Sequence, residues 1–190
     1  MGFQLDQFIA DCSNAVRQDA SHAHLREVVA RAVSDSAAVL RMLGEPIRAE
    51  MQCLFRSNEL TLLNVIWAPR MTLLPHNHQM VAVIGIYTGR EDNIFWRRVP
   101  GGESGRLEAV GAKALGEKET LPLGRDVVHS VINPISRLTG AIHVYTGDYF
   151  GVPRSEWDPE TLLEGPSDGE KMQRRFDEAN ALLSGIKTGA

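Results

Sequence analysis

The stretch from about residue 47 to 150 is divided into many short β-rich runs by regularly spaced turn residues, and this texture limits the folds open to the chain. Turn-forming pairs such as Ala68-Pro69 and Asn133-Pro134 separate the runs. Short strands with such regular punctuation are typical of a β-sandwich or barrel. The predicted strands cover residues 59–67, 71–75, 80–87, 94–99, 107–112, 127–132 and 138–145. We therefore predict a mainly β protein.

Helical patterns lie on both sides of this stretch. The first apolar stripe recurs every three or four positions and consists of Leu5, Phe8, Ile9, Cys12, Ala15 and Val16. A second helix is expected to carry Leu25, Val28, Val29 and Ala32. A third is expected to begin at a cap formed by Ser34 or Asp35 and to end at Gly44. Another helix is expected around residues 168–183. A chain of 190 residues is most simply one domain, with an N-terminal helical segment at 1–46, a β-barrel at 47–150 and a C-terminal extension at 151–190.

The composition argues against several classes of protein. Apolar residues make up 43% of the chain and charged residues 23%, as in ordinary soluble domains. The net charge of -4 and the lack of a basic stripe give nucleic-acid binding no support. No apolar run approaches the roughly 20 residues that span a bilayer, and no signal peptide is recognisable, so we expect no membrane association and a cytoplasmic location. Cys12 and Cys53 are expected to be reduced, mostly buried thiols.

Three histidines carry the main functional signal. His76 and His78 follow a proline and are two residues apart, so on a strand their side chains point to the same face. His129 follows a Pro-Leu-Gly turn at residues 122–124 and can arrive on another strand to complete a facial metal site. Residues 79–85 offer no carboxylate as a fourth ligand. Three neutral imidazoles leave a divalent metal with its full charge, which favours an anionic ligand such as a thiolate.

These residues resemble the two motifs of the cupin superfamily. His76-x-His78 followed by Gly89 is similar to the first motif, and the proline-x-glycine at 122–124 followed by His129 and Asn133 is similar to the second. The resemblance implies a double-stranded β-helix, a jelly-roll barrel that holds the metal inside. The usual cupin glutamate falls at residue 82 or 83, which are alanine and valine here, so the common site of three histidines and one glutamate is lost.

The missing glutamate narrows the resemblance to the thiol dioxygenases of the cysteine dioxygenase group, which use three histidines. Their second signature, S-x-H-x-Y, is similar to residues 141–145, where His143 and Tyr145 match and Ala141 replaces the serine. Their substrate-carboxylate arginine corresponds to Arg56. The resemblance thus implies catalytic roles for His143 and Tyr145, substrate binding by Arg56, and His76, His78 and His129 as metal ligands.

The activity that this resemblance implies is the oxidation of a small carboxylate-bearing thiol, cysteine or 3-mercaptopropionate, to its sulfinate by O2 at Fe(II). Histidine ligands also suit zinc and nickel, either of which can occupy such a site in purified protein. Two alternatives stay open. One is another three-histidine cupin enzyme, such as a β-diketone-type carbon–carbon-cleaving dioxygenase, and the other is a non-catalytic metal-binding cupin. The oligomeric state is left open.

Other polar residues near these motifs admit competing interpretations. Arg70, Arg97 and Arg98 compete with Arg56 for the carboxylate-binding role. Glu91 follows a Gly-Arg pair and is expected in a solvated turn, with a role behind the metal ligands as the alternative.

Overall fold

The computed structural model describes residues 2–18, 22–101 and 105–188 of the chain. Its elements follow the predicted order of helices, barrel and helix. The helices are α1 (Leu5–Gln18), α2 (Ala23–Ser34), α3 (Ser36–Leu43) and α4 (Gly169–Thr188). The strands are β1 (Glu50–Arg56), β2 (Thr61–Trp67), β3 (Thr72–Asn77), β4 (Ala82–Thr88), β5 (Arg90–Arg98), β6 (Leu107–Gly116), β7 (Thr120–Leu123), β8 (Val128–Ile132), β9 (Thr139–Tyr145), β10 (Ser155–Trp157) and β11 (Glu164–Pro166).

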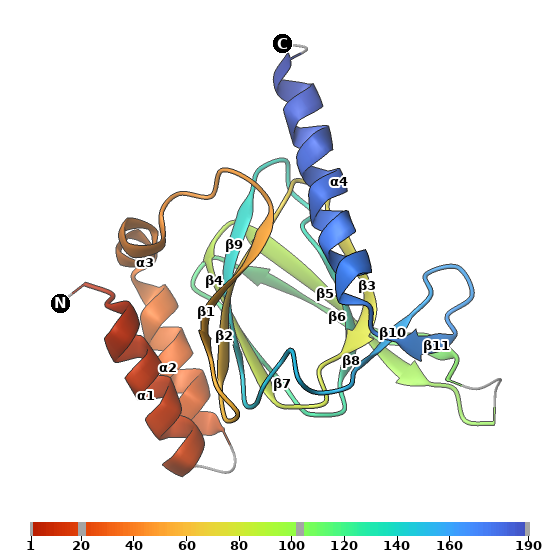
Figure 1. The fold of residues 1–190 in the computed structure, drawn as a ribbon, viewed down its shortest axis with the longest axis horizontal. Helices are drawn as coiled ribbons and strands as arrows, with labels where there is room; N and C mark the ends of the chain where they lie inside the picture. The colour runs from red at the N-terminus through yellow and green to blue at the C-terminus, as the bar shows by residue number, and fades with distance from the viewer. Residues whose placement is uncertain (1, 19–21, 102–104, 189–190) are drawn as a thin grey trace.

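The strands form two antiparallel sheets that face each other across the barrel (Figure 1). One sheet has the order β1-β2-β9-β4-β7, and the other has the order β11-β10-β3-β8-β5-β6. Between β2 and β10 the chain passes repeatedly from one sheet to the other, which is the winding of a double-stranded β-helix. The predicted fold class, a jelly-roll barrel with N-terminal helices and a C-terminal helix, is confirmed.

The strands β2, β4 and β9 at the centre of one sheet are buried almost throughout, on both faces. Alternate residues on these strands belong to different cores. Leu62 and Val83 pack outward in the cluster that includes α1 and α2, whereas Leu63 and Ile84 pack inward in the cluster that fills the barrel. Strands covered on both faces have continuous rather than alternating apolar sequences. The sequences of β2, β4 and β9 are mostly apolar in this way.

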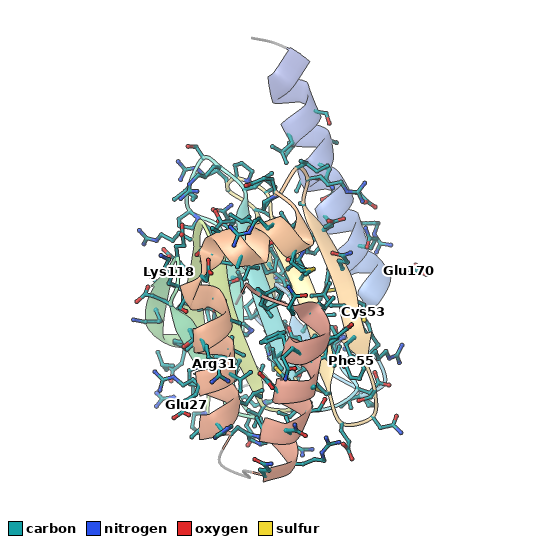
Figure 2. All side chains as sticks on the ribbon, turned by 90° about the vertical axis from the view of Figure 1, so that its left-hand side faces the viewer. Glu27, Arg31, Cys53, Phe55, Lys118 and Glu170 are labelled. Carbon is teal, nitrogen blue, oxygen red and sulfur yellow. The ribbon has the colours of Figure 1, made fainter. Side chains whose placement is uncertain are left out.

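The N-terminal helices form a layer on the outer face of this sheet (Figures 1 and 2). Asp35 caps α3 by accepting a hydrogen bond of 3.0 Å from the backbone N–H of Ala38, and Gly44 ends the helix with a φ of 89°. Both features were predicted. The helical layer lies very close to the sheet at Gly85, where an added Cβ would stand 2.6 Å from Val29 of α2. A glycine is therefore needed at this position of β4.

The two cysteines have different surroundings. Cys12 lies on the buried face of α1, and burial raises the pKa of its thiol, so it behaves as a small apolar residue. Cys53 is exposed on β1, at the edge of its sheet (Figure 2), and the expectation that it is buried is wrong. Both are free thiols, as predicted. Within the described part of the chain, no helix is both long enough and apolar enough to cross a membrane.

Helix α4 lies on the side of the barrel away from α1–α3, and its C-terminal part extends beyond the sheets (Figure 1). Its first turns place Met172 and Phe176 in the inner core. The Asp168 carboxylate caps it by accepting hydrogen bonds from two backbone N–H groups of the first turn. Farther along, the Asn180 side chain bonds both the N–H and the C=O of Ala49, at 2.7 and 2.8 Å. The helix is thus held against the barrel at several points.

Candidate metal centre

The three predicted ligand histidines meet inside the barrel. His76 lies on β3 and is paired in register with His129 on the neighbouring strand β8, while His78 follows β3 directly. The Nε2 atom of His78 lies 3.2 Å from the Nε2 of His76 and 3.2 Å from that of His129. All three side chains are buried. Within the described ranges, the group of potential ligand atoms that gather here contains these three histidines and no carboxylate.

The second ring nitrogens show which tautomers are present. His76 Nδ1 donates a hydrogen bond of 3.0 Å to the carbonyl oxygen of Leu74, and His129 Nδ1 donates one of 2.6 Å to Asn93 Oδ1. The Nε2 atoms of these two rings therefore carry lone pairs. A divalent cation between the three rings would accept these lone pairs. Nitrogens about 2.1 Å from a common ion, at angles near 100°, would stand about 3.2 Å apart, so the arrangement fits a divalent metal.

The protonation of the histidines also fits metal binding. Burial lowers the pKa of His76 to about 4 and places the pKa values of His78 and His129 well below their usual range. The rings are therefore neutral near pH 7 and available as ligands.

The predicted pair His143 and Tyr145 reaches the same cavity from β9. His143 Nδ1 lies 3.1 Å from the Tyr145 hydroxyl, and the Tyr145 ring stands edge-on to His78 with ring centroids 5.0 Å apart. Burial raises the pKa of Tyr145 well above its usual value, so the phenol keeps its proton and can donate a hydrogen bond. Sequence reasoning missed Tyr149, which follows β9 and lies against Tyr145 with centroids 4.4 Å apart.

Arg56 is not brought into this cavity. It lies at the end of β1, with 49% of its side chain exposed, and forms a two-point ion pair with Asp148 at 2.7 and 2.9 Å. Its three competitors are also engaged elsewhere. Arg70 donates to the carbonyl oxygen of Pro134, Arg97 is paired with Glu108, and Arg98 is paired with Glu164.

Arg154 is the arginine whose charge acts on the site. Its guanidinium lies over the Tyr149 ring, 3.8 Å from the centroid. Its charge adds to burial in lowering the pKa of His76 and His78. The Nε and one terminal nitrogen of Arg154 are buried and have no hydrogen-bond partner among the residues that the structure describes. It lies in the loop before β10, where no periodic pattern in the sequence fixes the direction of a side chain.

Glu91 is fully buried, so its expected position in a solvated turn is wrong. Strand β5 begins at the residue after Gly89, so that Glu91 and Asn93 point inward, while Arg90 and Asp92 pair with each other on the outside. Glu91 Oε2 accepts a hydrogen bond of 2.7 Å from Trp67 Nε1, and Oε1 accepts one of 3.0 Å from Asn93 Nδ2. Residues 90–93 are all polar, so no pattern in the sequence showed which of them point inward.

The space in front of the histidines is small and closed. It has a volume of about 20 Å³, which is room for about one water molecule. Apolar side chains form much of its wall, including Met51 of β1, Trp67 of β2, and Met172 and Phe176 of α4. Helix α4 thus closes the barrel over the site, and a ligand larger than water requires these side chains to move.

Comparisons with known proteins found matches among solved structures only. No protein-family model and no curated protein matches the sequence. A cupin-family protein with a double-stranded β-helix fold from Methanocaldococcus jannaschii is 9% identical, with a TM-score of 0.47, over 56% of this chain and 87% of that one. An oxalate oxidase in complex with the substrate analogue glycolate is 14% identical, with a TM-score of 0.41, over 55% of this chain and 53% of that one. The oxalate decarboxylase of Bacillus subtilis is 16% identical, with a TM-score of 0.39, over 48% of this chain and 22% of that one. The chain thus spans about half the length of the oxidase and about a fifth of the decarboxylase.

Proposed function

We propose that this protein is an Fe(II)-dependent thiol dioxygenase that oxidises a small carboxylate-bearing thiol, such as cysteine or 3-mercaptopropionate, to its sulfinate. In this reaction both atoms of O2 are added to the sulfur, which loses four electrons, and the thiol proton is released. The observation that carries the proposal is the convergence, among the described residues, of three neutral histidine nitrogens with no carboxylate ligand, beside the Tyr145 ring.

His76, His78 and His129 would hold the iron. Iron bound there would supply a centre at which a thiol loses its proton and O2 is activated. Because the ligands are neutral, they do not repel a thiolate, as a coordinated carboxylate would.

Two further groups would orient the substrate. Tyr145 keeps its proton and can donate a hydrogen bond to an oxygen atom at the site, while His143 Nδ1 holds its hydroxyl in place. Arg154 carries buried donors that have no partner, and its planar guanidinium suits a carboxylate. We therefore assign the carboxylate-binding role to Arg154 in place of Arg56.

The test is O2 uptake by Fe(II)-loaded protein, with sulfinate quantified, using cysteine, 3-mercaptopropionate and cysteamine side by side. The two acids should be preferred over cysteamine, which has no carboxylate. Arg154→Gln should raise KM for the acids about 10- to 100-fold, the expected effect of losing a charge-assisted hydrogen bond, and should abolish their advantage over cysteamine. Arg56→Gln is the matched control, because it removes the same charge from a residue engaged with Asp148, and it should leave KM unchanged.

A β-diketone-type carbon–carbon-cleaving dioxygenase is the second candidate. The apolar wall formed by Met51, Trp67 and Phe176 favours it, because such substrates carry no carboxylate. O2 uptake with a small β-diketone, insensitive to Arg154→Gln, together with no uptake on any of the three thiols, would replace the thiol dioxygenase by this enzyme.

A further inference from the structure

Glu91 is a buried carboxylate that the proposed reaction does not use. Its side chain is completely inaccessible to solvent. Among the described residues, no lysine or arginine lies within ion-pair distance of it, and its nearest ionisable partner is His143, whose Nε2 lies 3.5 Å from Oε2. A buried negative charge without a cation is costly, so a group of this kind is expected to have a counter-charge nearby.

One oxygen of Glu91 is connected to the metal ligands through Asn93. Since Asn93 Nδ2 donates to Glu91 Oε1, the amide is oriented with its oxygen toward His129. His129 Nδ1 donates to that oxygen at 2.6 Å, which leaves the Nε2 lone pair facing the other two histidines. Glu91 thus sets the direction of the amide, and the amide sets the tautomer of His129.

The other oxygen of Glu91 faces the second pair of site residues. Oε2 accepts from Trp67 Nε1 and lies beside His143 Nε2, a buried atom that has no hydrogen-bond partner in the structure. The opposite nitrogen of His143 contacts the Tyr145 hydroxyl. One carboxylate therefore lies between His129 on one side and the His143–Tyr145 pair on the other.

We propose that Glu91 provides the negative charge of this metal centre from behind the ligands. It is a positioning residue that holds His129 through Asn93 and partly balances a divalent ion at the three histidines. The proposal rests on the three histidines holding a divalent ion, as the proposed function requires, and not on the reaction that follows. It also accounts for a buried carboxylate in a barrel whose ligand set is neutral.

The test is the dissociation constant for Zn²⁺ and Co²⁺, measured by chelator competition with no substrate or O2 involved. Glu91→Gln keeps the size of the side chain and removes its charge, and it should weaken metal binding about 10- to 100-fold, the usual effect of losing an outer-sphere partner. Asp92→Asn is the matched control. It makes the same change of charge one residue away, in an outward ion pair with Arg90, and should leave the dissociation constant unchanged.

A merely structural role for Glu91 is separated by two further measurements. In thermal unfolding, Glu91→Gln should cost more stability in the metal-loaded protein than in the metal-free protein. Both forms lose one acceptor for the Trp67 or Asn93 N–H, and only the loaded form also loses the attraction between the carboxylate and the ion. The double variant Glu91→Gln, Asn93→Asp places a carboxylate directly on His129 Nδ1 and should recover most of the lost affinity.

Unchanged metal affinity in Glu91→Gln, or an equal loss in Asp92→Asn, would overturn the proposal. So would a metal-free variant that is destabilised as much as the loaded one, because that result indicates packing rather than charge. Failure of the proposed function has a different signature. A wild type that binds metal tightly and shows the Glu91 dependence, but oxidises no thiol, would reject the dioxygenase and keep this inference.

Discussion

Truncation of Phe176 tests whether α4 closes the barrel in solution. Phe176 is 2% exposed and stacks on Trp67, with ring centroids 5.6 Å apart and an angle of 26° between the planes. Replacing a buried phenylalanine by alanine typically costs about 3–5 kcal/mol, including the lost ring contact. Phe176 lies on a covering helix, where neighbours can relax and water can enter, so we expect the lower end, about 3 kcal/mol.

Urea denaturation of the metal-free protein measures this cost. With a slope of about 2 kcal/mol per molar urea, a loss of about 3 kcal/mol lowers the unfolding midpoint by about 1.5 M. Leu182→Ala is the control on the same helix. Leu182 is 72% exposed, so its truncation should change stability by less than about 0.5 kcal/mol.

The same variant should open the route to the histidines. A chelator should strip bound zinc faster from Phe176→Ala than from either the wild type or Leu182→Ala, because the closed space behind Phe176 becomes accessible. Equal unfolding midpoints and equal stripping rates for the two variants would refute the reasoning, since they would mean that Phe176 does not pack into the barrel.

Two further predictions concern protonation and packing. The folded protein keeps His76 neutral down to about pH 4, whereas an unfolded histidine takes up a proton near pH 6.5. The free energy of unfolding of the metal-free protein should therefore fall by roughly 3 kcal/mol through this residue as the pH falls from about 6.5 to 4. Urea midpoints that do not change over this range would contradict the prediction. Gly140→Ala would place a Cβ 2.3 Å from the Tyr87 ring, whose hydroxyl donates to Asn64, and should cost about 2–3 kcal/mol. Gly111→Ala, which has open space around it, should unfold at nearly the wild-type midpoint in the same urea titration.

The histidines could be placed from the sequence because strand geometry leaves little choice. His76 is on β3 and His78 follows it two residues later, so in extended backbone their side chains point to the same face. The pairing of β3 with β8 brings His129 beside them. The same two-residue periodicity predicted that the side chains of His143 and Tyr145 share a face of β9. Each of these predictions needed only a strand and its inward face.

The residues that sequence reasoning misplaced depend on loops and on where a strand begins. Arg56 was placed on the site by resemblance, but Asp148 from a distant loop holds it at the surface. Arg154 lies in a loop, whose backbone path no local pattern specifies. Glu91 was read as a turn residue because Gly89 precedes it, although the turn ends at that glycine and the strand begins at the next residue.

The charges of Arg154 and Glu91, whose positions the sequence did not reveal, lie at different parts of the metal centre. The Arg154 guanidinium lies over the Tyr149 ring, which in turn faces His78 with ring centroids 6.2 Å apart. Glu91 is instead connected to His129 and faces His143. An anion entering the site is attracted toward the first side and repelled from the second. We therefore expect a bound thiolate acid to place its carboxylate toward Arg154, and we expect exchange of the two charges, with arginine at 91 and glutamate at 154, to abolish binding of acidic thiols even in a variant that folds.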